Sequence, residues 1–381
     1  MGAKCCGGDG GRGKDVDKMS QAPGEAGPGE ESGGFRVSDL PDCLKAVYLE
    51  GFPGKPSFTV ERGKECYHED YVSHANIIEP GKPGPGPEDI SNLVIGFNKP
   101  VPDFKWDVKM VFRVGMPKGD KYVLCSTCSG TPEEEFLGTK PTGKGFNFMA
   151  IDIHWVLDDK IKESWHIEEL ATAIEQMTNK DSPAKVPPLH KGQEPHFDKA
   201  VQSSSALGKQ IKESDMPDCL KTFYQKMLVD KSTTAETVAA ALHENWISHP
   251  NGDESGTEGP GAKGQFEILQ NAWKTFPDWK WKTEAVLQVP LMENPAGPSQ
   301  EMLIHLATVE GSSDGKFLGL DLKSPKKFHI MAIDMHIVEE GKIAESWHIE
   351  DWGSCHEQLK AEGDAKLHNG QLPLNAEVGM A

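Results

Sequence analysis

Long apolar runs are missing from this sequence. None of its 381 residues belongs to an apolar run long enough to cross a bilayer, and the first residues lack the apolar stretch of a secretion signal. Clusters of Lys and Arg are missing too, since 59 acidic residues outnumber 40 basic ones and give a net charge of −19. Because nucleic-acid affinity depends on cationic side chains that neutralise phosphates, these absences argue against a nucleic-acid partner and favour a cytoplasmic protein.

Paired cysteine motifs are also scarce. Cys125 and Cys128 form the one C-x-x-C pair, and no second pair follows at a spacing that completes a zinc site. Residues three apart in a strand point to opposite faces, so we expect two buried strand thiols here. The sequence therefore predicts no metal site.

The first six residues, MGAKCC, match part of a lipid-anchor motif. Gly2 is a site for myristoylation and Cys5 or Cys6 for palmitoylation, and two such chains hold a protein at a membrane. However, Cys6 stands where myristoylation motifs usually have Ser or Thr. Two interpretations stay open: peripheral membrane attachment through the N-terminus, or a plain disordered N-terminal segment.

The sequence repeats itself once. SDLPDCLK at 38–45 returns as SDMPDCLK at 214–221, and ESWHIE at 163–168 returns at 345–350, in the same order along the chain. A period this long indicates a duplicated domain rather than a solenoid. The expected organisation is a disordered Gly-rich tail at 1–34, a first domain at 35–178, a Pro-rich linker at 179–212, a second domain at 213–360 and a tail at 361–381.

Each copy has helical spacing of apolar residues first and alternating, strand-like runs afterwards. This order predicts an α+β fold, with helices gathered on an antiparallel sheet. The last two strands of copy two are joined by EEGK at 339–342, which favours a type I turn closed by Gly341 in a left-handed bulge.

That turn sorts the last two strands into an apolar and a polar face. On the apolar face we expect Ile333, Met335, Ile337, Ile343, Trp347 and Ile349 in copy two, and Ile151, Ile153, Trp155, Ile161, Trp165 and Ile167 in copy one. On the polar face we expect Asp334, His336, Ser346, His348 and Glu350, and their counterparts Asp152, His154, Ser164, His166 and Glu168. The apolar faces predict that the two copies pack sheet to sheet as a pseudo-dimer.

Two alternatives remain at this point. The polar face could be the ordinary solvated side of an antiparallel sheet. A register slip of one residue would turn Trp inward and His outward, and would make Glu169 and Asp351 the inward carboxylates.

The segments 130–169 and 317–352, which contain FLGTKPTGKGFNFMAIDIH and KIAESWHIEDW, resemble the SnoaL-like polyketide cyclase and ester cyclase family. The stretches HEDYVSH at 68–74 and PDWKW at 277–281 match in order as well. The resemblance covers both copies. It implies a cone-shaped α+β barrel around a helix-capped pocket, no metal or organic cofactor, and ring closure by aldol chemistry through a carboxylate on the last strand.

The chain departs from the family at that carboxylate, because His166 and His348 occupy its position while Asp152 and Asp334 occupy that of a pocket histidine. The expected catalytic pair in each copy is therefore a histidine base oriented by an aspartate. The residues expected to complete the pockets are His74, His154, Ser164, Glu168, His249, His336, Ser346 and Glu350. We expect a cofactor-independent cyclase or isomerase acting on a carbonyl-containing small molecule, or alternatively a non-catalytic module that binds a small molecule or a protein.

Overall fold

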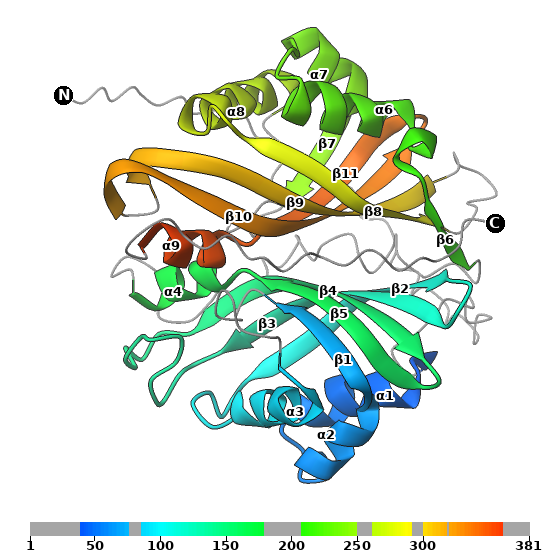
Figure 1. Ribbon diagram of the computed structural model, residues 1–381, viewed down its shortest axis with the longest axis vertical. Coiled ribbons are helices and arrows are strands. Elements are labelled where there is room, and N and C mark those ends of the chain that lie inside the picture. The colour runs from blue at the N-terminus through cyan, green and yellow to red at the C-terminus, as the bar shows by residue number, and fades with distance from the viewer. Residues whose placement is uncertain are drawn as a thin grey trace, which may run out of the picture. The chain divides into compact units, whose positions relative to one another are not determined.

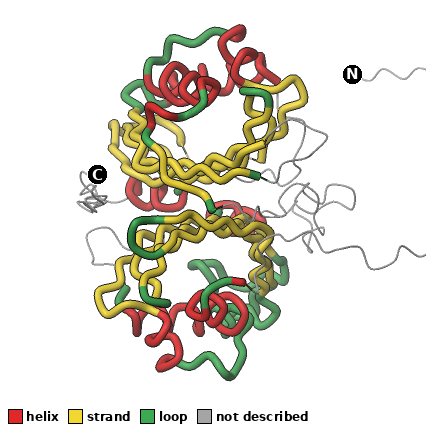
Figure 2. Tube along the Cα trace, turned by 90° about the vertical axis from the view of Figure 1, so that its right-hand side faces the viewer, coloured by secondary structure: helices red, strands yellow, loops and turns green. Residues whose placement is uncertain are grey.

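The computed structural model describes residues 39–75, 85–178, 207–249, 261–291, 300–317 and 320–360. The predicted tails, most of the predicted linker and the acylation sites Gly2, Cys5 and Cys6 lie outside these ranges. Within them, each copy begins with short helices and continues into a curved sheet, as the α+β prediction requires (Figure 1). Figure 2 shows the strands of each copy curving around its helices.

Copy one starts its second helix at Thr59, whose side-chain oxygen accepts a hydrogen bond from the backbone N–H of Arg62. Its elements are α1 (Asp42–Lys45), the π-helix η2 (Ala46–Gly51), α2 (Val60–Cys66), β1 (Tyr67–Ala75), α3 (Pro87–Gly96), β2 (Lys105–Gly115), β3 (Asp120–Gly130), β4 (Phe146–Leu157), β5 (Lys160–Glu168) and α4 (Leu170–Thr178).

Copy two repeats this order after an additional strand and a short 3-10 helix, and Thr234 caps the helix α7 by accepting from the backbone N–H of Thr237. Its elements are β6 (Gly208–Ile211), the short 3-10 helix η3 (Glu213–Asp215), α6 (Asp218–Lys221), the π-helix η4 (Thr222–Val229), α7 (Ala235–Ala241), β7 (Leu242–His249), α8 (Gly261–Thr275), β8 (Lys280–Pro290), β9 (Gln300–Phe317), β10 (Leu320–Glu339), β11 (Lys342–Glu350) and α9 (Trp352–Lys360).

In the described ranges the strands form one eleven-stranded sheet, in the order β1-β5-β4-β3-β2-β6-β8-β9-β10-β11-β7. The centre is β6, which lies at the end of the predicted linker and pairs with β2 of copy one and β8 of copy two. A Cβ atom at Gly208 would lie 2.8 Å from the carbonyl oxygen of Gln288, so this junction requires glycine. The end of the predicted linker is thus a strand that joins the two copies.

The turn between the last two strands differs from the prediction. Glu340 and Gly341 both have positive φ, at 50° and 75°, which is the pattern of a two-residue type I′ turn. The bulge falls later, at Ala344, because Val338 pairs with Ile343 whereas Ile337 pairs with Glu345. Copy one has the same irregularity at Lys162.

Because the bulge is displaced, two residues predicted for the apolar face lie on the opposite face. Ile343 and Ile161 turn to the helix-covered side of the sheet, where they join the cores of copy two and copy one. The remaining alternation is confirmed, since Met335 lies opposite Trp347 and Asp334 opposite His348.

The slipped register is wrong. Glu169 Oε2 accepts a hydrogen bond from the backbone N–H of Met149, and Asp351 Oδ1 accepts one from the backbone N–H of Ser354 at the start of α9. The interpretation of the polar face as a solvated surface is also wrong, because Asp334 and His336 are only 3% and 1% exposed.

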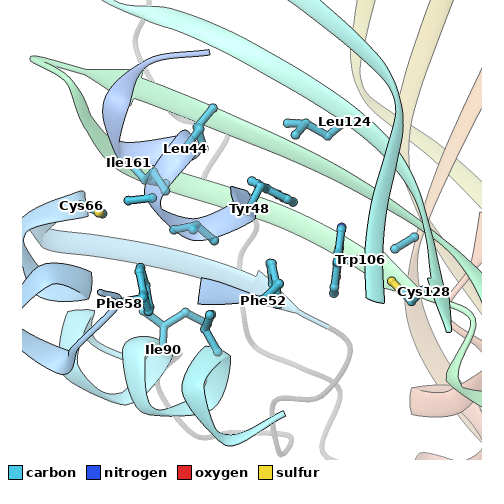
Figure 3. Packing of buried hydrophobic residues seen from close by; sticks show 14 of the residues in the cluster. Leu44, Tyr48, Phe52, Phe58, Cys66, Ile90, Trp106, Leu124, Cys128 and Ile161 are labelled. Carbon is cyan, nitrogen blue, oxygen red and sulfur yellow. The ribbon is translucent and has the colours of Figure 1, made fainter. Parts of the chain in front are cut away.

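Each copy has its own aromatic core between sheet and helices. In copy one the ring of Phe52 stacks on Trp106 with centroids 4.0 Å apart, and Tyr48 meets Trp106 edge-on (Figure 3). Such contacts add stability beyond the area that they bury. They also fix the π-helix η2 over the sheet, and η4 holds the same position in copy two.

A third cluster of buried apolar side chains draws on both copies. It contains Trp165 and Trp347, each 1% exposed, together with Phe112, Ile304 and Met335. These are the side chains that alternate away from the helix-covered face, so the cluster agrees with the expected packing of the apolar faces.

The C-x-x-C pair behaves as predicted. Cys125 belongs to this third cluster, whereas Cys128 lies in the aromatic core of copy one, on the opposite face of β3. Both are buried free thiols, and burial raises the pKa of each.

Trp347→Ala should lower the free energy of unfolding by about 3–5 kcal/mol, because it opens a cavity among side chains of both copies. Urea denaturation measures this loss. Ile268→Ala, at a position that is 53% exposed, is the control and should change stability by less than about 0.5 kcal/mol. Equal effects of the two substitutions would contradict the burial of Trp347.

Candidate active site

A row of polar side chains crosses three neighbouring strands of copy two. Asp334 on β10 lies directly opposite His348 on β11 and directly opposite His305 on β9. Side chains that are directly opposite on adjacent strands share a face and come into contact distance. The row therefore places a carboxylate between two imidazoles on the helix-covered side.

The π-helix η4 brings Tyr224 onto this row. Its hydroxyl donates to Asp334 Oδ2 at 2.8 Å and lies 2.6 Å from His336 Nε2. The sequence analysis missed this residue, although a tyrosine follows the repeated PDCLK segment by three positions in both copies, at Tyr48 and Tyr224. That repeated position was the available signal.

The hydrogen bonds around Tyr224 run in one direction. Trp246 Nε1–H can only donate, and it donates to Ser346 Oγ at 3.0 Å. The Tyr224 hydroxyl donates its single hydrogen to Asp334, so its oxygen accepts from His336 Nε2–H. Nδ1 of the neutral His336 therefore accepts from Ser346 Oγ at 2.8 Å. The chain ends at the carboxylate of Asp334.

The charge states of the residues fit this direction. Burial lowers the pKa of His336 well below its ordinary value, so its imidazole is neutral. Burial, aided by the charge of Glu350, raises the pKa of Asp334 to about 7 against the opposing effects of His348 and Tyr224. Asp334 Oδ1 is buried and has no hydrogen-bond partner among the described residues.

The pKa of His348 is shifted in the opposite direction from that of His336. Burial by itself would lower its pKa, but the charge and hydrogen bond of Glu350 outweigh that effect and, with Asp334, raise the pKa to about 9. Its Nδ1 lies 3.3 Å from Glu350 Oε1, and its side chain is 32% exposed. His348 is therefore an imidazolium at neutral pH.

Copy one repeats most of this arrangement. Tyr48 lies 2.6 Å from His154 Nε2, and His154 Nδ1 lies 2.7 Å from Ser164 Oγ. Burial lowers the pKa of His154 to about 3 and raises that of Asp152 to about 7.

His166 in copy one is held from both sides. Its Nδ1 lies 3.0 Å from Glu168 Oε1 and its Nε2 lies 3.3 Å from Ser73 Oγ. Burial opposes its charge, but Glu168 and then Asp152 raise its pKa above the ordinary value. Both ring nitrogens of His166 thus have protein partners.

The predicted aspartate–histidine pairs are arranged differently from the expectation. Asp334 and His348 lie directly opposite each other, but each is held by another residue, Tyr224 for the aspartate and Glu350 for the histidine. A histidine with a raised pKa is protonated, which does not suit the expected neutral base.

His74 and His249 do not join the polar cluster, contrary to the prediction. Each follows an inward serine, such as Ser73, and successive strand residues point to opposite faces. His74 Nε2 lies 2.8 Å from Glu163 Oε1, and its ring stacks on Trp165 with centroids 5.3 Å apart. His249 makes the same contacts in copy two, at 2.9 Å and 5.0 Å.

Asp334, His348 and Glu350 also have the donor types of a cation site. One ligand atom from each lies within 4.8 Å of the other two. The raised pKa of His348 opposes coordination, because a metal-binding imidazole must first lose its proton. The Asp334 carboxylate is therefore also close to the imidazolium of His348.

No helix in the described ranges combines the length and apolar character needed to span a membrane.

The model of the SnoaL-like polyketide cyclase family matches residues 57–177 and 219–359, one match in each copy. The chain belongs to the SnoaL-like polyketide cyclase family. A comparison with curated proteins found no match.

Three solved structures illustrate the similarity of single copies to bacterial proteins. A protein described as a SnoaL-like polyketide cyclase from Jannaschia sp. CCS1 is 16% identical, covers 38% of this chain and 91% of its own, and has a TM-score of 0.31. IdmH from Streptomyces antibioticus, described as a polyketide cyclase, is 23% identical over 37% of this chain and 96% of its own, with a TM-score of 0.29. TsrD from Streptomyces laurentii is 23% identical over 37% and 92%, with a TM-score of 0.28.

Tyr224→Phe should lower the free energy of unfolding by about 1–3 kcal/mol, because it leaves a buried His336 N–H and Asp334 Oδ2 without their partner. Tyr48→Phe in copy one should act in the same direction. Chemical denaturation measures both. A Tyr224→Phe variant as stable as the wild type would contradict the directed chain of hydrogen bonds.

Proposed function

We propose that the chain is a cofactor-independent acid/base enzyme that removes a proton next to the carbonyl group of a small molecule. The observation that carries the proposal is the pairing, within 4.8 Å, of a buried carboxylate and a histidine that holds its proton. The expected use of the histidine as base is revised, since Asp334 becomes the base and His348 the acid.

Asp334 has the properties of a base for carbon acids. Its pKa of about 7 leaves a substantial ionised fraction at neutral pH, and a carboxylate with a raised pKa is the stronger base. Tyr224 occupies Oδ2, so the lone pairs of Oδ1 remain for the substrate proton.

His348 supplies the complementary charge. When Asp334 Oδ1 takes the proton, the electron pair of the C–H bond moves onto the carbonyl oxygen, and an imidazolium stabilises the resulting enolate. Glu350 orients this imidazolium through Nδ1. Part of the ring is exposed, which leaves a surface for the substrate.

Ring closure follows from the same two groups. The enolate carbon attacks a second carbonyl carbon of the same molecule, a C–C bond forms, and the new alkoxide takes a proton from His348. Asp334 then returns the proton that it removed to the imidazole, so the enzyme ends in its starting state. If the enolate is reprotonated at carbon instead, the outcome is isomerisation or exchange with solvent hydrogen.

Family membership supports this chemistry, because the family model is named for polyketide cyclases. The alternative, non-catalytic ligand binding, is favoured by one observation in copy one, where Ser73 and Glu168 occupy both nitrogens of His166. The two functions differ in whether a bound carbonyl compound exchanges its hydrogen.

Asp334→Asn should reduce the exchange of solvent deuterium into benzylacetone by about a hundredfold or more, because the amide cannot accept the proton. His348→Gln should reduce it by a smaller factor, since it removes a charge but keeps a hydrogen-bond donor. Proton NMR follows the exchange.

The control for these variants is Asp351→Asn. It changes a buried carboxylate at the start of the helix α9, and asparagine is as effective a helix N-cap as aspartate. It should keep the wild-type rate. Wild-type protein that binds benzylacetone without exchanging its hydrogen would instead support the binding module.

The exchange rate should depend on pH with a maximum between about 7 and about 9. It rises as pH passes the pKa of Asp334, because the base must be ionised, and falls as pH passes that of His348, because the acid must hold its proton. Initial rates across this range measure the profile. A rate that is already constant from pH 5 upward would contradict the assignment of Asp334.

A further inference from the structure

His305 distinguishes copy two from copy one. It lies on β9 directly opposite Asp334, whereas the residue opposite Asp152 on β3 is Leu124. The two copies therefore share the aspartate and the histidine of the last strand but differ on the other side of the aspartate.

The imidazole of His305 is held in place by its neighbours. Its ring stacks on Tyr224 with centroids 3.8 Å apart and planes at 16°, and its Nε2 lies 3.0 Å from Thr283 Oγ1. The side chain is 1% exposed, and burial lowers its pKa to about 3, so it is neutral. Its Nδ1 is buried and has no hydrogen-bond partner among the described residues.

A buried nitrogen without a partner costs about 1–3 kcal/mol. Leu124 shows that the corresponding position of the sheet accepts an apolar side chain without that cost. Two buried polar atoms without partners, His305 Nδ1 and Asp334 Oδ1, thus belong to residues that face each other across adjacent strands. A bound molecule that contacts both would remove both penalties.

We propose that His305 is a substrate-binding residue and that it makes copy two the reactive copy. In this proposal His305 is the tautomer in which Nε2 accepts from the Thr283 hydroxyl, so that the ring hydrogen on Nδ1 donates to an oxygen of the substrate. This inference rests on the proposed function of Asp334 and His348. It adds the class of substrate: a carbonyl compound with a second oxygen, as hydroxyl or carbonyl, on the far side of the acidic carbon.

Two probes separate this inference from the proposed function. Benzylacetone has one carbonyl oxygen, whereas the aldol adduct of benzaldehyde and acetone has the same carbon skeleton with a hydroxyl on the far side of the acidic carbon. Wild-type protein should exchange the adduct with a kcat/KM about tenfold above that for benzylacetone, as expected for one additional hydrogen bond.

His305→Leu should abolish this preference, because KM for the adduct should rise about tenfold more than KM for benzylacetone, which offers Nδ1 no second oxygen. His305→Gln keeps an amide donor and should restore part of the preference. His305→Leu should also be as stable as the wild type or more stable, because it removes an unsatisfied nitrogen. Leu124→Met is the matched control in copy one and should change neither probe.

The outcomes distinguish the two claims. A His305→Leu variant that retains the preference, or a wild type that shows none, overturns the role of His305 while exchange itself still supports the proposed function. Exchange that survives Asp334→Asn places the reaction outside copy two and overturns the inference that copy two is the reactive copy. A wild type that exchanges neither probe contradicts the proposed function as well.

Discussion

The hydrogen bond from the Tyr224 hydroxyl to Asp334 Oδ2 connects the two parts of the copy-two site, the helices and the sheet. It comes from a π-helix that the aromatic core fixes over the sheet, and it sets the direction of the hydrogen bonds that continue through His336 and Ser346 to Trp246. Because this bond occupies one carboxylate oxygen, the other is left with its lone pairs in a buried setting. The proposed chemistry depends on that division of the two oxygens.

One face of the sheet packs apolar side chains, and the other face contains the polar residues of the site. Trp347 and its neighbours bury the apolar face among side chains of both copies, and the alternation of the strand sends His348 to the other side. A charged imidazolium can persist there because Glu350 and Asp334 both stabilise it. The repeated ESWHIE segment therefore serves packing through its tryptophan and the site through its histidine.

The repeated segments were sufficient to predict the two copies, and the order of helical and alternating runs was sufficient to predict the α+β fold. The alternation of AIDMH and ESWHIE placed Asp334, His336 and His348 on one face, because side-chain period is a property of the local sequence. The displaced bulge at Ala344 was not predictable, since Glu340 and Gly341 both adopt left-handed backbone conformations and so replace the expected turn. Tyr224 and His305 were missed for a different reason. They reach Asp334 from segments distant in sequence, and no periodicity in either segment encodes that contact.

The pKa values could not be inferred from residue types either. The sequence suggested a histidine base and an orienting aspartate, whereas the burial of Asp334 and the proximity of Glu350 to His348 support the opposite assignment that we propose. Such a reversal depends on which carboxylate contacts the imidazole, and that is fixed by the register of the strands rather than by composition.

An NMR titration of the whole chain, with labelled Asp carboxyl carbons and His ring nitrogens, tests the central claim most directly. The account predicts that Asp334 titrates near pH 7 and that His348 keeps its proton until about pH 9. An Asp334 that titrates near its ordinary pKa of 3.8, beside a His348 that is neutral above its ordinary 6.5, would contradict the assignment of base and acid.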